Sequence, residues 1–197
     1  NNTEKENLKR KCHLQYKQLD VVTKNKPCIS VGDRITLAGI RWIIVNIDVS
    51  QKIAMLLSED IVCTHYYHEK RTGTVWAYCS LRQWLNTEFL NRFRPEEKNR
   101  IIKTRLENQG NEDWDTDGGR DTEDYIFVLS KKECERISER FRKIDSYWWI
   151  RTPGYFQGTA TFVLTKDSHI DTYSYYDVDQ QCGVRPSLWI DLEKLLF

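Results

Sequence analysis

The sequence predicts one α+β domain, and three observations lead to this prediction. The chain has 197 residues, a length typical of a single domain. Seven Trp, ten Tyr and seven Phe give it a heavy aromatic content, which favours a packed core over disorder. Helical patterns come early and extended patterns come late. This order is typical of α+β folds rather than of alternating βαβ units.

Residues 1–27 are predicted to be an N-terminal extension, and residues 28–197 the domain itself. Apolar side chains recur at helical spacing in the extension, and Pro27 disfavours continuation of a helix. One interpretation is an amphipathic helix that docks on the domain or leads from a stalk, and through which the chain oligomerises. The alternative is a frayed linker to another segment.

Extended patterns follow the extension. Residues 34–37 predict a short strand, and residues 41–48 and 52–57 predict a hairpin around Val49, Ser50 and Gln51. Trp42, Ile44 and Met55 are expected in the core.

Two capping boxes predict helix starts. The first, Ser80 to Gln83, begins a helix that runs to about Arg92, and the second is Ser130 to Glu133. Pro95 at a first helical position predicts a short helix to Ile102. Between these helices, residues 125–129 read as a buried strand.

The end of the chain is predicted to be mostly strands, at residues 148–151, 159–165, 169–173 and 184–191. Arg151 and Arg185 stand among apolar residues, so we expect each to be partly buried and paired with a carboxylate or with backbone carbonyls. Trp148, Trp149 and Trp189 are expected to be core anchors.

A polar, tyrosine-rich segment, residues 169–181, lies among those strands and suggests a recognition surface. Tyr offers a large amphipathic contact area at low entropic cost, while Ser, Asp and Gln supply adaptable hydrogen bonds. The alternative is an ordinary exposed hairpin with Tyr on its solvated face. The predicted ligand-binding residues are Tyr155, Phe156, Gln157, Ser168, His169, Asp171, Tyr173, Tyr175, Tyr176, Asp177, Asp179 and Gln181.

Charge limits the class of partner. The net charge is +1, so no overall field attracts nucleic acid or anionic lipid. After Pro153 the carboxylates outnumber the basic residues, which disfavours a phosphate-rich ligand at the predicted surface. No apolar run approaches the roughly 20 residues that cross a bilayer. Neither the compartment nor the state of the six cysteines follows from the sequence, and an exported or cell-surface location is slightly favoured.

An acidic loop, residues 113–124, spells D-x-D-x-D-G-x-x-D-x-x-D. Carboxylates at these positions, with Gly at the sixth, can surround a Ca²⁺ ion, and the spelling resembles the calcium loops of dockerins and thrombospondin repeats. The alternative is an uncoordinated acidic loop whose carboxylates cap turns. The predicted metal ligands are Asp113, Asp115, Asp117, Asp121 and Asp124.

Other chemistry has weaker support. Cys63, His65, His68 and Cys79 are zinc ligands by type, but their spacing fits no common zinc module. The chain has no nucleophile elbow, no H-E-x-x-H motif and no glycine-rich phosphate loop. We therefore predict no enzymatic activity.

The motifs W-W-I-R-T-P-G at Trp148 to Gly154 and G-V-R-P-S-L-W at Gly183 to Trp189 resemble those of a large family of uncharacterised bacterial domains. The resemblance extends to residues 76–85 and 121–130, and spans about residues 30–192. That family is similar in turn to the C-type-lectin-like fold, which formylglycine-generating enzymes and the variable proteins of diversity-generating retroelements share.

The resemblance implies a C-type-lectin-like domain, with a twisted antiparallel sheet, a few helices and a loop-rich face. It implies non-catalytic recognition of a protein or glycan ligand, with the tyrosine-rich segment as the variable face if the chain is a retroelement-diversified protein. The sugar-binding motifs of true C-type lectins are absent, which favours a protein. One alternative is an enzyme related to the formylglycine-generating group, although Cys182 stands alone where those enzymes place a cysteine pair. Another alternative is a structural cap on a stalk or oligomer.

Overall fold

The computed structural model describes residues 29–164, 170–171 and 176–195, and these residues form a sheet-rich domain with a few short helices. The predicted N-terminal helix or linker lies outside the described residues. Among the described helices, none combines the length and the apolar content that a membrane-spanning helix needs.

The first sheet joins strands from both ends of the domain. Its order is β1 (Arg34–Leu37), β2 (Ile40–Asp48), β3 (Ile53–Ser58), β12 (Ser187–Asp191) and β5 (Ile101–Ile102), and all its pairs are antiparallel. The predicted hairpin of β2 and β3 is confirmed, with a register shift between Ile44 and Asn46.

The second sheet has the order β10 (Ile170–Asp171), β9 (Ala160–Val163), β8 (Trp148–Pro153), β11 (Gln181–Val184) and β4 (Cys63–Tyr66). Its β11–β8 pair is parallel, and its other pairs are antiparallel. A third sheet consists of β6 (Thr104–Leu106) and β7 (Thr122–Asp124). The short strands β4, β5, β6 and β7 were not predicted.

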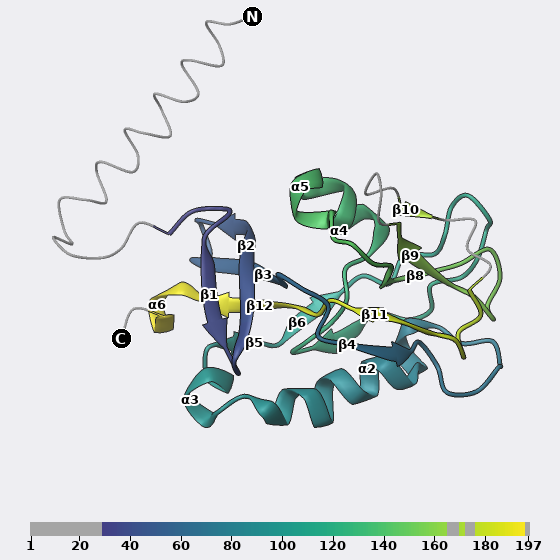
Figure 1. Cartoon of the computed structure of the whole chain (residues 1–197), viewed down its shortest axis with the longest axis horizontal. Coiled ribbons are helices and arrows are strands. Elements are labelled where there is room, and N and C mark those ends of the chain that lie inside the picture. Colours follow the sequence, from purple (N-terminus) through teal and green to yellow (C-terminus); the bar gives the residue numbers. More distant parts are fainter. Residues whose placement is uncertain (1–28, 165–169, 172–175, 196–197) are drawn as a thin grey trace, which may run out of the picture. The chain divides into compact units, whose positions relative to one another are not determined.

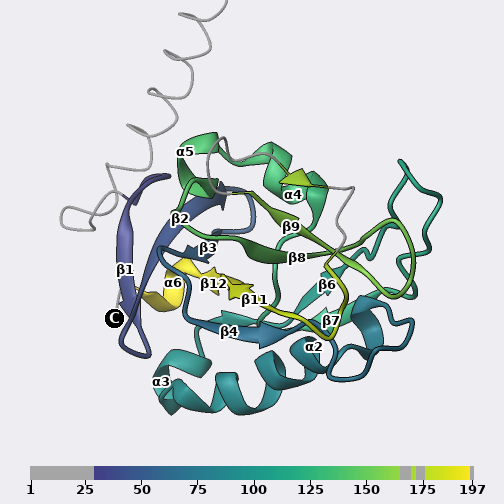
Figure 2. The ribbon, with the colours of Figure 1, turned by 45° about the vertical axis from the view of Figure 1, so that its right-hand side comes forward.

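The helices lie on opposite sides of the sheets (Figures 1 and 2). On one side, α2 (Ser80–Trp84) continues through a π-helical turn, Leu85–Phe89, and is followed by α3 (Pro95–Lys98). On the other side lie α4 (Lys131–Arg136) and α5 (Glu139–Arg142). The short α6 (Leu192–Leu195) follows the last strand.

Large aromatic side chains fill the core between these layers. The predicted anchors Trp42, Trp148 and Trp149 are fully buried, as is Phe127. Trp189 is only half-buried, so its assignment as a core anchor is only partly correct.

Both motif arginines are buried, as predicted. Arg185 donates to the carbonyl oxygens of Ser58, at 2.8 and 3.1 Å, and of Phe141, at 2.9 Å. Its guanidinium carbon lies 4.9 Å from the Trp148 ring centroid. Burial lowers the pKa of Arg185 to about 10, so the side chain stays charged at neutral pH. Arg185 thus connects the junction of β11 and β12 to the ends of β3 and α5.

Arg151 likewise connects β8 to distant residues, here to Val128 and to Glu133 of α4. Its guanidinium pairs with both carboxylate oxygens of Glu133 and donates to the carbonyl of Val128 at 3.1 Å. Glu133 is also the third residue of α4, and its carboxylate accepts from the Ser130 amide at 2.8 Å. The capping box predicted at Ser130 is therefore confirmed, and one carboxylate anchors both α4 and β8.

Three local predictions are wrong. The cap of α2 is Cys79, whose sulfur accepts from the Arg82 amide, because the Ser80 hydroxyl is engaged with His68 and the Glu69 amide. Residues 125–129, predicted to be a buried strand, join no sheet apart from a bridge of Phe127 to Ser187, although residues 126–129 are buried. Helix α3 ends at Lys98, because Ile101 and Ile102 pair with β12.

Candidate functional site

Three exposed aromatic side chains from two distant segments meet at one place on the described surface. We call Trp114, Tyr155 and Phe156 the aromatic surface, and their exposed fractions are 40%, 37% and 44%. The ring centroids of Trp114 and Tyr155 are 6.1 Å apart, and those of Tyr155 and Phe156 are 4.5 Å apart. Both contacts are edge to face, a favourable geometry for aromatic pairs.

A tight turn presents Trp114. The backbones of Asn111 and Thr116 bond to each other at 2.8 and 3.2 Å and close the turn, while Asp115 takes the left-handed φ of 51° that Asp tolerates in turns. Two of the five predicted calcium ligands, Asp113 and Asp115, therefore flank Trp114 within this turn.

Side-chain hydrogen bonds hold this turn against the segment that carries Tyr155 and Phe156. Asn111 donates to the Pro153 carbonyl at 3.0 Å, and Gln157 donates to the Asp117 carbonyl at 2.8 Å. Gly154 is required beside them, because a Cβ there would lie 2.2 Å from the Thr159 hydroxyl. The two segments are thus fixed as one unit.

Four of the five predicted calcium ligands contact protein partners in this structure. Asp113 pairs with Lys131 at 2.7 Å, and an Asp117 carboxylate oxygen accepts from the Gly119 amide at 2.9 Å. Asp121 accepts from Arg105 at 3.0 Å, a hydrogen bond that lowers the pKa of Asp121. Asp124 is buried and accepts from Trp76, Arg82 and Thr122 at 2.7 to 2.9 Å.

Calcium binding by this loop stays a prediction. Within the described residues no group of three or more His, Cys, Asp and Glu side chains converges in a way that would hold a metal ion. Calcium would have to displace Arg82 and Trp76 from Asp124, or use only the outer carboxylates of the loop.

The remaining predicted ligand residues are only partly described. Tyr176 packs on Phe162 and Trp149 with centroid distances of 4.9 and 6.1 Å. Asp177 pairs with Arg71 at 2.7 Å, and Gln181 accepts from Thr64 at 3.3 Å. Asp179 is half-buried. Ser168, His169, Tyr173, Tyr175 and the side chain of Asp171 lie outside the described residues.

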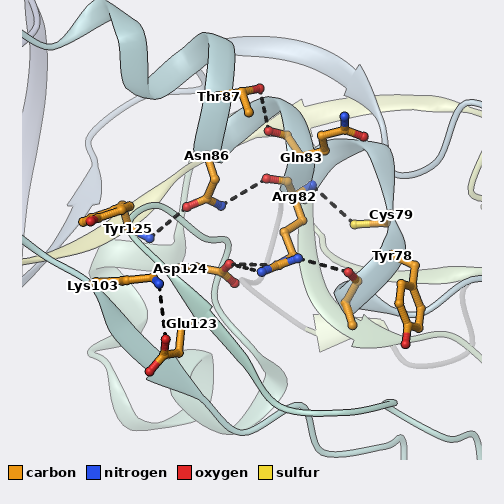
Figure 3. Close-up of a pocket in the computed structure, with 11 residues that line it drawn as sticks. Tyr78, Cys79, Arg82, Gln83, Asn86, Thr87, Lys103, Glu123, Asp124 and Tyr125 are labelled. Carbon is orange, nitrogen blue, oxygen red and sulfur yellow. Dashed lines mark hydrogen bonds and ion pairs between the residues drawn. The ribbon is translucent and has the colours of Figure 1, made fainter.

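A pocket of about 500 Å³ lies over the predicted motif at residues 76–85. Figure 3 shows its centre, where Arg82 points to Asp124 between Tyr78 and Tyr125. Arg82 bonds to Asp124 at 2.7 Å and to the Ala77 carbonyl at 3.0 Å. Asn86 bonds to the backbone at Tyr125 and Ile126. The polar motif residues are therefore used to hold α2 against β7, and this accounts for the motif without a ligand.

The zinc candidates are also engaged within the fold. His65 stacks on Trp84 at a centroid distance of 4.9 Å, and His68 contacts the Ser80 hydroxyl at 3.1 Å. Burial raises the pKa of the Cys63 thiol, and that of Cys79 to about 12. Both thiols are protonated at neutral pH, which is unfavourable for metal ligation and for nucleophilic attack.

The sequence analysis did not predict Trp114 at the surface, because it interpreted the acidic loop only through its carboxylates. An aromatic residue within a run of Asp and Gly is itself a signal, since a turn of this composition lies at the surface.

Comparison with known protein families gives a match over most of the domain. The family model described as a domain of unknown function, DUF6273, matches residues 52–192. No curated protein matches the chain, and no solved structure matches it.

Proposed function

We propose that this chain, which belongs to the DUF6273 family of domains of unknown function, is a non-catalytic recognition module. Its ligand is a protein, and the contact is made by the aromatic surface of Trp114, Tyr155 and Phe156, together with the polar side chains around it.

The observation that carries this proposal is the meeting of three exposed aromatic rings from segments some 40 residues apart. Trp, Tyr and Phe are enriched at protein interfaces, and Trp and Tyr are among the residues that dominate binding energy. The two segments are held together by side-chain hydrogen bonds, so little further ordering is needed when a ligand binds.

The orientation of the rings favours a protein over a glycan. Tyr155 stands at 68° to Trp114 and at 82° to Phe156, so the rings do not form one flat platform. A stepped surface of this kind suits insertion of amino-acid side chains better than stacking of sugar rings. The neighbouring carboxylates favour a ligand with basic groups at the rim of the contact.

The cysteines support a non-catalytic role. Burial raises the pKa of the thiols of Cys79 and Cys182 to about 12, so neither is a ready nucleophile near neutral pH. The copper chemistry of the formylglycine-generating group would require Cys182 as a thiolate, which its burial disfavours.

We further propose that the fold is C-type-lectin-like. The support is a first sheet that unites the first and last strands of the domain, and a second sheet whose β8–β9 connection carries Tyr155 and Phe156. An experimental structure superposed on C-type-lectin-like domains tests this assignment.

The binding proposal is tested with a phage-displayed library of random dodecapeptides, selected on the wild-type protein. We expect peptides rich in aromatic and basic residues, whose affinity falls about tenfold or more with Trp114→Ala or Tyr155→Ala. The matched control is Tyr125→Ala, because Tyr125 is 38% exposed and Tyr155 is 37% exposed.

Two outcomes would contradict the proposal. Selected peptides that bind all three variants equally well would place the binding site elsewhere. If no peptide is selected and a glycan array gives binding that Trp114→Ala abolishes, the ligand is a sugar.

A further inference from the structure

A second concave surface, separate from the aromatic surface, runs along β6. This groove has a volume of about 570 Å³. The turn after β2, strands β5, β6 and β12, and helix α4 contribute to it, and its lining includes every residue from Ile102 to Glu107. We call it the β6 groove.

The floor of the β6 groove is apolar. Ile53, Ile102 and Trp189 line it, and each is half-buried rather than fully covered. Trp189 and Ile102 are direct cross-strand partners in the first sheet. A half-buried Trp beside two Ile residues supplies the kind of apolar anchor site that protein ligands fill.

The walls of the groove are basic. Arg151 and Glu133 line the groove but neutralise each other. The remaining charged residues of the lining are Lys103, Arg105, Lys132 and Arg136 against Asp48 and Glu107. Four cations therefore face two carboxylates, although the chain as a whole carries a net charge of only +1.

Three of these cations have ion-pair partners outside the groove. Lys103 pairs with Glu123 at 3.2 Å, Arg105 with Asp121 at 3.0 Å, and Lys132 with Glu112 at 3.1 Å. The three basic side chains are 46% to 76% exposed. Such exposed pairs contribute only about 0 to 1 kcal/mol, so they can exchange their partners for a ligand carboxylate.

Strand β6 also offers an unpaired backbone edge. In the described part of the chain β6 pairs only with β7, in a two-stranded sheet. No further backbone hydrogen bond joins residues 103–107 to another described segment. An unpaired edge is a template on which an extended peptide can add as a new strand.

We propose that the β6 groove binds an extended acidic peptide segment of a partner protein. The peptide adds to the free edge of β6, places apolar side chains on Ile53, Ile102 and Trp189, and directs carboxylates to the four basic side chains of the walls. Alternation along a strand sends successive side chains to opposite faces, so the peptide alternates acidic and apolar residues.

The test uses an array of synthetic octapeptides in which Glu or Asp alternates with Val, Ile, Leu, Phe or Trp. A second array carries Lys and Arg in the acidic positions. We expect binders in the acidic array and none in the basic array, and we expect the affinity of the best binder to fall with added salt.

Charge-reversal variants locate the site. Arg105→Glu combined with Arg136→Glu should reduce the affinity of the best peptide at least tenfold. The matched control combines Arg140→Glu with Lys143→Glu, which makes the same change in charge on exposed side chains outside the groove lining and should change the affinity less than twofold. Circular dichroism of both double variants checks that they are folded.

Strand addition is tested without altering the protein. Methylation of alternate backbone nitrogens of the best peptide removes the hydrogen bonds that a ladder needs, and methylation in one of the two registers should reduce binding about tenfold or more.

Several outcomes would overturn the proposal. The groove is not the site if no acidic peptide binds, or if the best peptide binds the Arg105 and Arg136 double variant as tightly as the wild type. Strand addition is wrong if N-methylated peptides in both registers bind unchanged. Tighter binding of a single-stranded oligothymidylate than of any acidic peptide would assign the groove to nucleic acid.

Discussion

At the residue scale, single charged side chains join elements that are distant in the sequence. Arg185 donates to carbonyls at the end of β3 and in α5, and Arg151 joins β8 to α4 through Glu133. A guanidinium suits both positions because its planar fork presents several donors at once. Replacing such a group leaves buried acceptors without partners.

Arg185→Lys is therefore expected to lower the free energy of unfolding by roughly 2–4 kcal/mol, because one ammonium cannot replace the fork that reaches Ser58 and Phe141. Urea unfolding followed by tryptophan fluorescence measures the change. Arg34→Lys is the control, since Arg34 is 60% exposed in its ion pair with Glu59, and it should change the free energy by less than about 0.5 kcal/mol. Equal effects of the two substitutions would contradict the assigned role of Arg185.

Glu97 is a buried carboxylate whose effect depends on pH. Burial alone would raise its pKa, but hydrogen bonds from the amides of Ala38 and Arg94 and the charge of Arg94 outweigh burial, so the pKa lies below its ordinary value of 4.5. A lowered pKa in the folded state means that Glu97 stabilises the fold above pH 4.5 and loses this effect as the pH falls through the folded-state pKa.

Glu97→Gln is expected to reduce stability by about 1–3 kcal/mol at pH 7, because the amide accepts fewer of these hydrogen bonds. The difference from the wild type should shrink as the pH falls below 4.5. Glu96→Gln, on the neighbouring exposed side chain, is the control and should have little effect. A difference between wild type and Glu97→Gln that stays constant down to pH 2 would show that the charge of Glu97 is not the cause.

At the scale of elements, α4 depends on one carboxylate with two roles. Ser130→Ala removes only one cap bond, that of the Glu133 amide to the hydroxyl at 3.2 Å, and should cost about 1 kcal/mol. Glu133→Ala also leaves Arg151, 3% exposed, without its carboxylate, and should cost about 3–5 kcal/mol. Thermal unfolding measures both changes, with exposed Glu135→Ala as the control. Similar costs for Ser130→Ala and Glu133→Ala would show that the buried ion pair adds nothing.

The elements that the sequence predicted well are those with strong local signals. The β2 and β3 hairpin has alternating apolar residues around a turn, and the capping box at Ser130 has both of its reciprocal bonds in the structure. The elements that it missed are short strands such as β4 and β6. Their pairing with β11 and β7 depends on distant residues, and a window of three or four residues does not encode it.

In the candidate site, too, the contacts between residues distant in the sequence could not be predicted. Tyr155 and Phe156 were predicted from the composition of their segment, and the structure exposes both. Trp114 joins them only because Asn111 and Gln157 hold two loops together, a long-range contact that no periodicity announces. The β6 groove was missed for a similar reason, since five separate stretches of the chain line it.

At the scale of the whole molecule, the cysteines report how cooperatively the domain opens. Cys63 is half-buried, whereas Cys79, Cys134 and Cys182 are buried. Cys79 lies in the layer of α2, Cys134 in α4 and Cys182 in β11, so together they sample both helical layers and the second sheet.

In a protein with Cys12→Ser and Cys28→Ser, which removes the two cysteines outside the described residues, we expect one thiol per chain to react early with Ellman's reagent at pH 8. This thiol is Cys63, and the three buried thiols should then react together at the rate of global opening, because each is covered by packing that spans different elements. Urea near the unfolding midpoint should merge the two phases into one. Separate rates for Cys134 and Cys182 in native buffer would instead show that α4 opens independently of the second sheet, and that the Arg151–Glu133 pair does not couple them.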